Sequence, residues 1–104
     1  MAIMSTEVSI EELRKAVEHM HPCRASWLKS ELVQDKFQGR TAWNGIVQVF
    51  ELSDHPSATR CYAWSSPVEG SEKRRFFAVL QIPPVETALD AVRAAIVQEE
   101  RTKR

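Results

Sequence analysis

The sequence has little of what disulfide-rich, phosphate-binding or strongly basic proteins depend on. It contains two cysteines, too few for a disulfide framework, and three glycines, with no glycine-rich loop that could cradle a phosphate. Lysine and arginine number 14, and aspartate and glutamate also number 14. The formal net charge is therefore zero, and any binding to nucleic acid or to an anionic membrane would have to come from a local patch.

Long hydrophobic runs are also missing. No stretch approaches the roughly 20 apolar residues of a membrane span, and the first residues lack the basic and apolar segments of a signal peptide. We therefore expect a cytoplasmic protein whose two cysteines remain free thiols. Hydrophobic residues at 43% and charged residues at 27% are typical of one globular domain, expected over residues 1–104 with fraying at 1–8 and 100–104.

Two segments near opposite ends of the chain carry helix-start signals. Residues 9–12 and 87–90 each place a hydroxyl at an N-cap position and a carboxylate three residues later, where both can satisfy backbone N–H groups. Apolar residues at helical spacing follow each signal, which predicts helices over residues 10–20 and from 88 toward 100. Pro22 ends the first helix because it lacks a backbone N–H.

Between these helices the sequence predicts four strands, over residues 25–37, 46–52, 59–64 and 74–82. The second is the clearest, because β-branched and aromatic residues occupy both of its faces. In the first predicted strand, the apolar side chains change from one face of the strand to the other partway along it. Either a β-bulge switches the faces, or this is an edge strand whose charges discourage sheet-to-sheet association. A helix over residues 27–37 is the competing interpretation.

The connections between the predicted strands are short, which favours antiparallel neighbours over parallel ones. We therefore predict an α+β fold of order α-β-β-β-β-α. Its sheet is an antiparallel meander, and the N-terminal and C-terminal helices pack together on one face. The residues match no family pattern specific enough to transfer a site.

A basic and aromatic grouping is the main candidate binding site. Its members are Arg60, Tyr62, Trp64, Lys73, Arg74, Arg75 and Phe77. On an antiparallel sheet these rows can become neighbours, with cations for phosphates and flat rings for stacked bases. Trp43, beside a turn, is a candidate anchor for a protein partner. The competing interpretation is that the rings fill the core and the arginines form cross-strand ion pairs.

Metal-binding and catalytic motifs are weak. His19, His21 and Cys23 lie close in sequence, but ligands two positions apart on a helix point in different directions, so we expect no metal and no cofactor. Nucleophilic catalysis would need Cys61, Cys23 or a serine beside a base. Cys61, with His55 six residues earlier, forms the basis of a weaker hypothesis of a thiol enzyme.

The absence of catalytic motifs favours a small binding or regulatory module that acts through protein–protein contacts without catalysis. Its protein partner is unknown, and a homodimer formed by strand pairing or by a helix-free sheet face is one hypothesis. A nucleic-acid-binding protein that uses the basic and aromatic grouping is the alternative.

Overall fold

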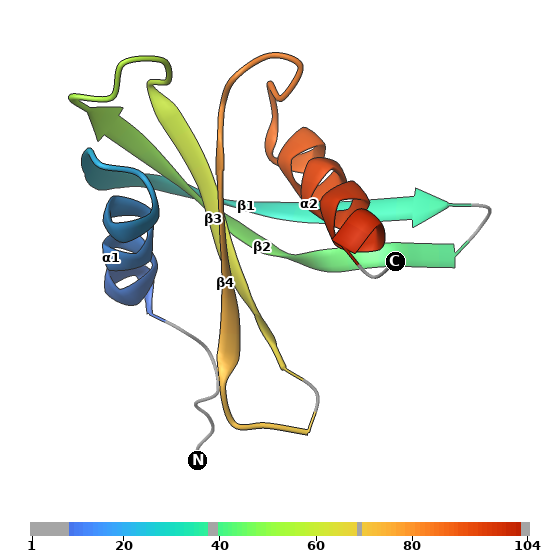
Figure 1. Cartoon of the computed structure of the whole chain (residues 1–104). Coiled ribbons are helices and arrows are strands. Elements are labelled where there is room, and N and C mark those ends of the chain that lie inside the picture. Colours follow the sequence, from blue (N-terminus) through green and yellow to red (C-terminus); the bar gives the residue numbers. More distant parts are fainter. Residues whose placement is uncertain (1–8, 38–39, 69, 103–104) are drawn as a thin grey trace.

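The computed structural model describes residues 9–37, 40–68 and 70–102, without the side chains of residues 37, 40–42 and 99–102. The elements follow one another as α1 (Ile10–Met20), β1 (Arg24–Phe37), β2 (Arg40–Ser53), β3 (Arg60–Pro67), β4 (Arg74–Leu80) and α2 (Ala88–Thr102) (Figure 1). The strands form one sheet in the order β1-β2-β3-β4, and each neighbouring pair is antiparallel. The predicted α+β class and α-β-β-β-β-α meander are confirmed.

Both helices begin at the predicted caps. At α1 the Ser9 hydroxyl accepts from the Glu12 N–H at 3.1 Å, and the Glu12 carboxylate accepts from the Ser9 N–H at 3.2 Å. At α2 the Thr87 hydroxyl accepts from the Asp90 N–H at 3.1 Å, but the Asp90 carboxylate accepts from the N–H of Glu86, one residue before the cap. The second cap is therefore stabilised by a variant of the reciprocal bonding at the first.

The last turn of α2 includes residues that we expected to fray. Residues 100–102, expected to fray, continue the helix to Thr102. Glutamate, glutamine and arginine are good helix formers, so a polar end need not stop a helix. Residues 1–8, 103 and 104 of the predicted frayed ends lie outside the described residues. No helix among the described residues is long and apolar enough to cross a lipid bilayer.

The segment that the sequence left ambiguous is a strand with a bulge. In β1, Trp27 lies opposite Phe50, but Lys29 lies opposite Val49, so Leu28 is the extra residue. Leu28 packs into the apolar cluster beneath α2. Both explanations offered for the change of parity hold, since β1 contains a bulge and is also an edge strand, and the competing helix is wrong. The extra residue lets apolar side chains of both parities reach the interior.

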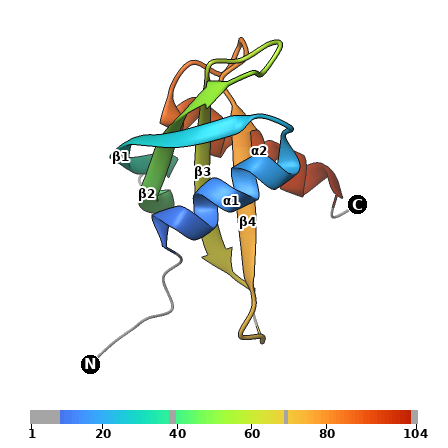
Figure 2. The ribbon, with the colours of Figure 1, turned by 90° about the vertical axis from the view of Figure 1, so that its left-hand side faces the viewer.

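The helices do not share a face of the sheet, contrary to our expectation. On one side α1 covers Phe50 and Cys61, and on the other α2 covers Val49 and Tyr62. Figure 2 shows α1 in front of the sheet and α2 behind it. β2 and β3 carry apolar side chains on both faces of the sheet, so each face must be shielded from water. One helix covers each face.

Two separate cores result. The α1-side core contains Leu13, Val17, Ala25, Phe50, Leu52, Ala58, Cys61 and Ala63. The α2-side core contains Val33, Val47, Val49, Tyr62, Trp64, Ala88, Ala91 and Val92. The sheet, with β2 and β3 at its centre, separates the two clusters.

Candidate binding groove

The predicted sheet face is assembled, but its rings are covered. Arg60, Tyr62 and Trp64 share the α2 side of β3, and Tyr62 and Trp64 are each only 3% exposed beneath α2. The Tyr62 hydroxyl donates to the Glu86 carbonyl at 3.1 Å and accepts from the Gln81 amide at 2.9 Å. Burial raises the pKa of Tyr62. These rings serve as core, and their faces are closed to a stacked base.

The three consecutive cations do not gather on one face. Arg74 points to the α1 side, where its Nε donates to the Ser65 hydroxyl at 3.0 Å. Arg75 points to the α2 side, with its guanidinium 5.2 Å from the centre of the Phe77 ring. Lys73 precedes β4 and is exposed. Neighbouring residues of a strand face opposite ways, so a basic run on a strand cannot form a one-sided patch.

Three of the predicted residues form an aromatic row across β2, β3 and β4. The rings of Trp43 and Trp64 meet edge to face with centroids 6.0 Å apart, and Trp64 stacks on Phe77 at 5.1 Å. A Cβ added at Gly45 would lie 2.9 Å from the Trp43 ring, so the glycine lets the indole lie across β2. Trp43, considered from the sequence as an exposed anchor, is half-buried in this row.

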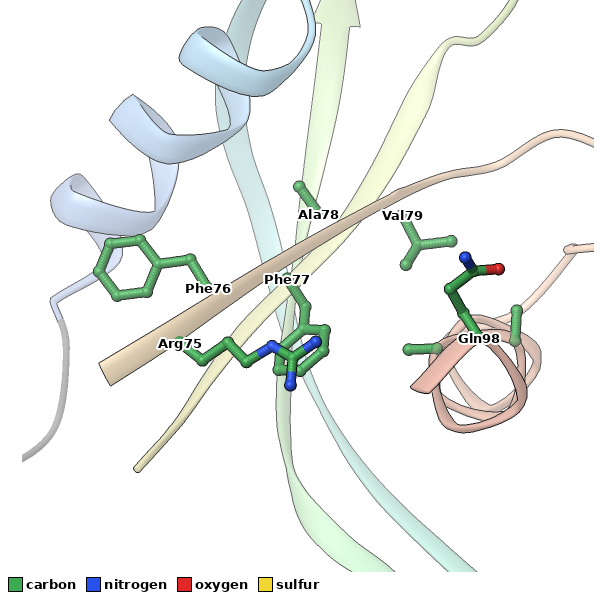
Figure 3. A pocket seen from close by; sticks show the side chains of 8 residues that line it. Arg75, Phe76, Phe77, Ala78, Val79 and Gln98 are labelled. Atoms are coloured by element: carbon green, nitrogen blue, oxygen red, sulfur yellow. The ribbon is translucent and has the colours of Figure 1, made fainter. Parts of the chain in front are cut away.

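A cavity of about 370 Å³ lies between β4 and α2. Residues 75–79 line it from the strand, and Ala94, Ala95 and Gln98 line it from the helix. Figure 3 shows Phe77 and Val79 on the side of β4 that faces this space, whereas Phe76 points toward α1. The alanines leave room because they carry no side chain beyond Cβ. We call this cavity the β4–α2 groove.

The groove opens beside an edge strand. The Val68 N–H donates to Lys73 and the Gln81 N–H donates to Arg60, which directs the backbone groups of odd-numbered β4 residues toward β3. Backbone groups of the even-numbered residues therefore point outward. Near the end of β4 two of these carbonyls have partners: Ala78 O lies 3.0 Å from His21 Nε2, and Leu80 O accepts from Ile82 N.

Phe76 lies in the half of the edge that remains open. No described residue bonds to its outward N–H and C=O, and its neighbours Arg75 and Phe77 line the groove. Unpaired groups of this kind are a template for another strand. Sequence reasoning missed Ala94, Ala95 and Gln98, because the helix face that lies against an edge strand depends on tertiary packing. The small side chains of Ala94 and Ala95 were the only signal in the sequence for a groove at this place.

The candidate nucleophile Cys61 is buried, and the candidate base His55 is bonded within its own loop. Cys61 is fully buried, and burial raises its pKa to about 12, so the thiol is protonated at neutral pH. Burial also raises the pKa of Cys23, with the Glu18 and Asp54 carboxylates adding to the effect. His55 Nδ1 instead accepts from the N–H groups of its own loop, those of Ser57 and Ala58.

Among the described residues, no group of three histidine, cysteine, aspartate or glutamate side chains is placed to hold a metal ion. The cluster singled out from the sequence is separated by its other contacts, since His21 bonds to β4 and Cys23 packs against the α1-side core.

The β4–α2 groove therefore combines an apolar cavity, a cation and an open strand edge. Comparisons of the chain with protein-family models, with curated proteins and with solved structures find no match.

Proposed function

We propose that the protein is a non-catalytic binding module that takes an extended segment of a partner protein along the β4 edge. The observation that carries the proposal is the groove of about 370 Å³ beside the outward backbone of Phe76. Strand addition obtains affinity from main-chain hydrogen bonds and specificity from pockets for alternate side chains. The β4 edge and the adjacent groove offer both.

The register of such a segment follows from the alternation of β4. The partner residue that pairs with Phe76 would point its side chain to the α1 side. The residues before and after it would point to the α2 side, where Phe77 and Ala95 line the groove. An apolar residue at one of these two positions would enter the cavity.

Charge favours an acidic residue in the partner segment. Residues 67–75 carry three cations and two carboxylates, and the guanidinium of Arg75 lies at the groove beside Phe77. A carboxylate at the second groove-facing position of the partner would meet this cation at the rim. The partner segment is thus an extended stretch with an apolar and an acidic residue two positions apart.

Peptide display tests the proposal. Short random peptides on phage are selected on the immobilised protein, and binders are compared on Ala94→Trp, which fills the groove from an exposed position. The matched control is Val97→Trp, on the same helix and 50% exposed, outside the groove lining. We expect binders to weaken at least tenfold, about 1.4 kcal/mol, on Ala94→Trp and to bind the control like wild type.

Other outcomes contradict the proposal. If selection yields no binder, or binders that ignore Ala94→Trp, the groove is not the site. Binding of single-stranded RNA that survives Ala94→Trp and is lost in Arg74→Ala and Arg75→Ala would instead support the nucleic-acid alternative.

A further inference from the structure

The opposite edge of the sheet carries apolar side chains that neither helix covers. Leu32 of β1 is 71% exposed, and Ile46, its direct neighbour on β2, is 56% exposed. Both point to the α1 side, but the β1–β2 hairpin extends well beyond α1 (Figure 1). Two large aliphatic side chains thus form an exposed cross-strand pair at a sheet edge, the kind of surface that proteins usually pair or protect.

The backbone of β1 beside this pair points outward. The Leu52 N–H donates to the Thr59 carbonyl, so in β2 the even-numbered residues bond toward β3 and the odd-numbered ones toward β1. The β1 partners of those odd-numbered residues are Lys29, Glu31 and Val33. The alternating residues of β1 therefore direct their N–H and C=O groups away from the sheet; they are Ser30, Leu32 and Gln34.

We propose that this edge pairs with β1 of a second copy of the chain, antiparallel, about a two-fold axis at Leu32. Leu32 of each copy then exchanges both backbone hydrogen bonds with the other, and Ser30 lies opposite Gln34. The two sheets join into one, and Ile46 and Leu32 of each copy form a continuous apolar row across the junction.

The charges of β1 favour this register. An axis at Leu32 places Lys29 opposite Asp35 of the second copy, on the α2 side, where Asp35 also bonds to Arg93 of its own chain at 3.1 Å. An axis at Glu31 would oppose two Glu31 carboxylates, and an axis at Val33 would oppose Glu31 and Asp35. Like charges directly opposite on a sheet are destabilising, so both of these registers are disfavoured.

One further register also pairs opposite charges. An axis at Ser30 places Lys29 opposite Glu31, but it also places Leu32 opposite Leu28. The bulge interrupts β1 at Leu28, and that side chain packs beneath α2, so Leu32 would stay uncovered. Like charges therefore disfavour the axes at Glu31 and Val33, and the bulge disfavours the axis at Ser30. The axis at Leu32 meets neither obstacle.

The proposed pairing is independent of the β4–α2 groove, because β1 and β4 are opposite edges of the sheet. Sedimentation equilibrium over a concentration series tests it. We expect the 11.9 kDa chain to reach twice that mass at high concentration. Leu32→Asp places two carboxylates directly opposite each other at the axis. We expect it to raise the dimer dissociation constant at least tenfold. Val97→Asp, at another exposed position, is the control and leaves the constant unchanged.

Engineered cysteines test the register in chains with Cys23 replaced by serine. Directly opposite residues have Cα atoms about 5.5 Å apart, within disulfide range. Leu32→Cys should therefore cross-link to itself on mild oxidation. Ser30→Cys alone should not, since the two copies of this residue would lie about 13 Å apart along the strands. A mixture of Ser30→Cys and Gln34→Cys chains should give the mixed dimer.

Three results overturn the pairing. A monomer at every concentration excludes it, and a dimer that withstands Leu32→Asp places the contact elsewhere. Cross-linking of Ser30→Cys to itself in preference to Leu32→Cys would shift the axis. Circular dichroism of each variant confirms that the fold is retained, which is expected because Leu32 is largely exposed.

Discussion

His21 Nε2 lies 3.0 Å from the carbonyl oxygen of Ala78, and this contact fastens the end of α1 to the outer edge of β4. His21 is the C-cap of α1, and its own N–H donates to Val17 O. One residue therefore ends a helix and occupies part of a strand edge. The contact limits any added strand to the first half of β4, next to the groove, and protects the other half from pairing.

We expect His21→Ala to destabilise the fold by about 1 kcal/mol, the usual contribution of a hydrogen bond, because the Ala78 carbonyl loses its partner. Urea unfolding measures the change. His19→Ala, at an exposed position in the last turn of the same helix, is the matched control and should cost less. Equal losses in the two variants would show that the contact between His21 and β4 contributes nothing.

Gly45→Ala is expected to displace the Trp43 indole from Trp64. The new Cβ would come within 2.9 Å of the Trp43 ring, and loss of the edge-to-face contact should cost about 1 kcal/mol. Near-ultraviolet circular dichroism reports the changed pairing, and urea unfolding reports the cost. In a Trp43→Ala background the same substitution should have little effect. An equal cost in both backgrounds would mean that the indole is not the obstacle.

Trp64→Ala should destabilise the fold by about 3–5 kcal/mol, because it empties a buried site between Trp43 and Phe77. Thermal and urea unfolding provide the measurement. Trp27→Ala is the comparison, since that indole is 48% exposed and should contribute much less. A well-folded Trp64→Ala protein would contradict the assignment of this ring to the core.

Stability should fall at alkaline pH because of Cys61. Its pKa is raised from 9.0 to about 12 by burial, so above pH 9 the unfolded chain loses this proton before the folded one does. The loss approaches about 1.4 kcal/mol per pH unit between these two values. Tyr62, whose pKa is also raised, adds a fall in the same direction at higher pH.

Urea unfolding of the wild-type protein and of Cys61→Ala is measured at about pH 8 and about pH 10. The difference between the two proteins gives the contribution of the thiol to the alkaline loss of stability. We expect the wild-type protein to lose more stability between the two conditions. Alkylation gives a second measurement: at the lower pH Cys23 should react before Cys61 in the folded protein, because Cys23 is half-buried and Cys61 has no exposed surface. Similar alkaline losses in both proteins would contradict the role of the buried thiol.

The helices and strands were predictable because short-range forces select them. Ser9 and Thr87 accept backbone N–H groups only three residues away, so a helix start is visible in four residues. The bulge at Leu28 was among the alternatives for the same reason, since a change of apolar parity within one strand records it. In each case the cause and its effect lie within a few residues of chain.

The layout of the faces required the tertiary structure. Tyr62 and Trp64 share a parity, but the sequence does not say whether water, nucleic acid or a helix covers them; α2 does. The contact between His21 and Ala78 joins residues 57 positions apart, and the β4–α2 groove lies between a strand edge and alanines of a later helix. Such contacts depend on how the whole chain buries two apolar sheet faces at once. Local periodicity does not indicate which helix covers which face.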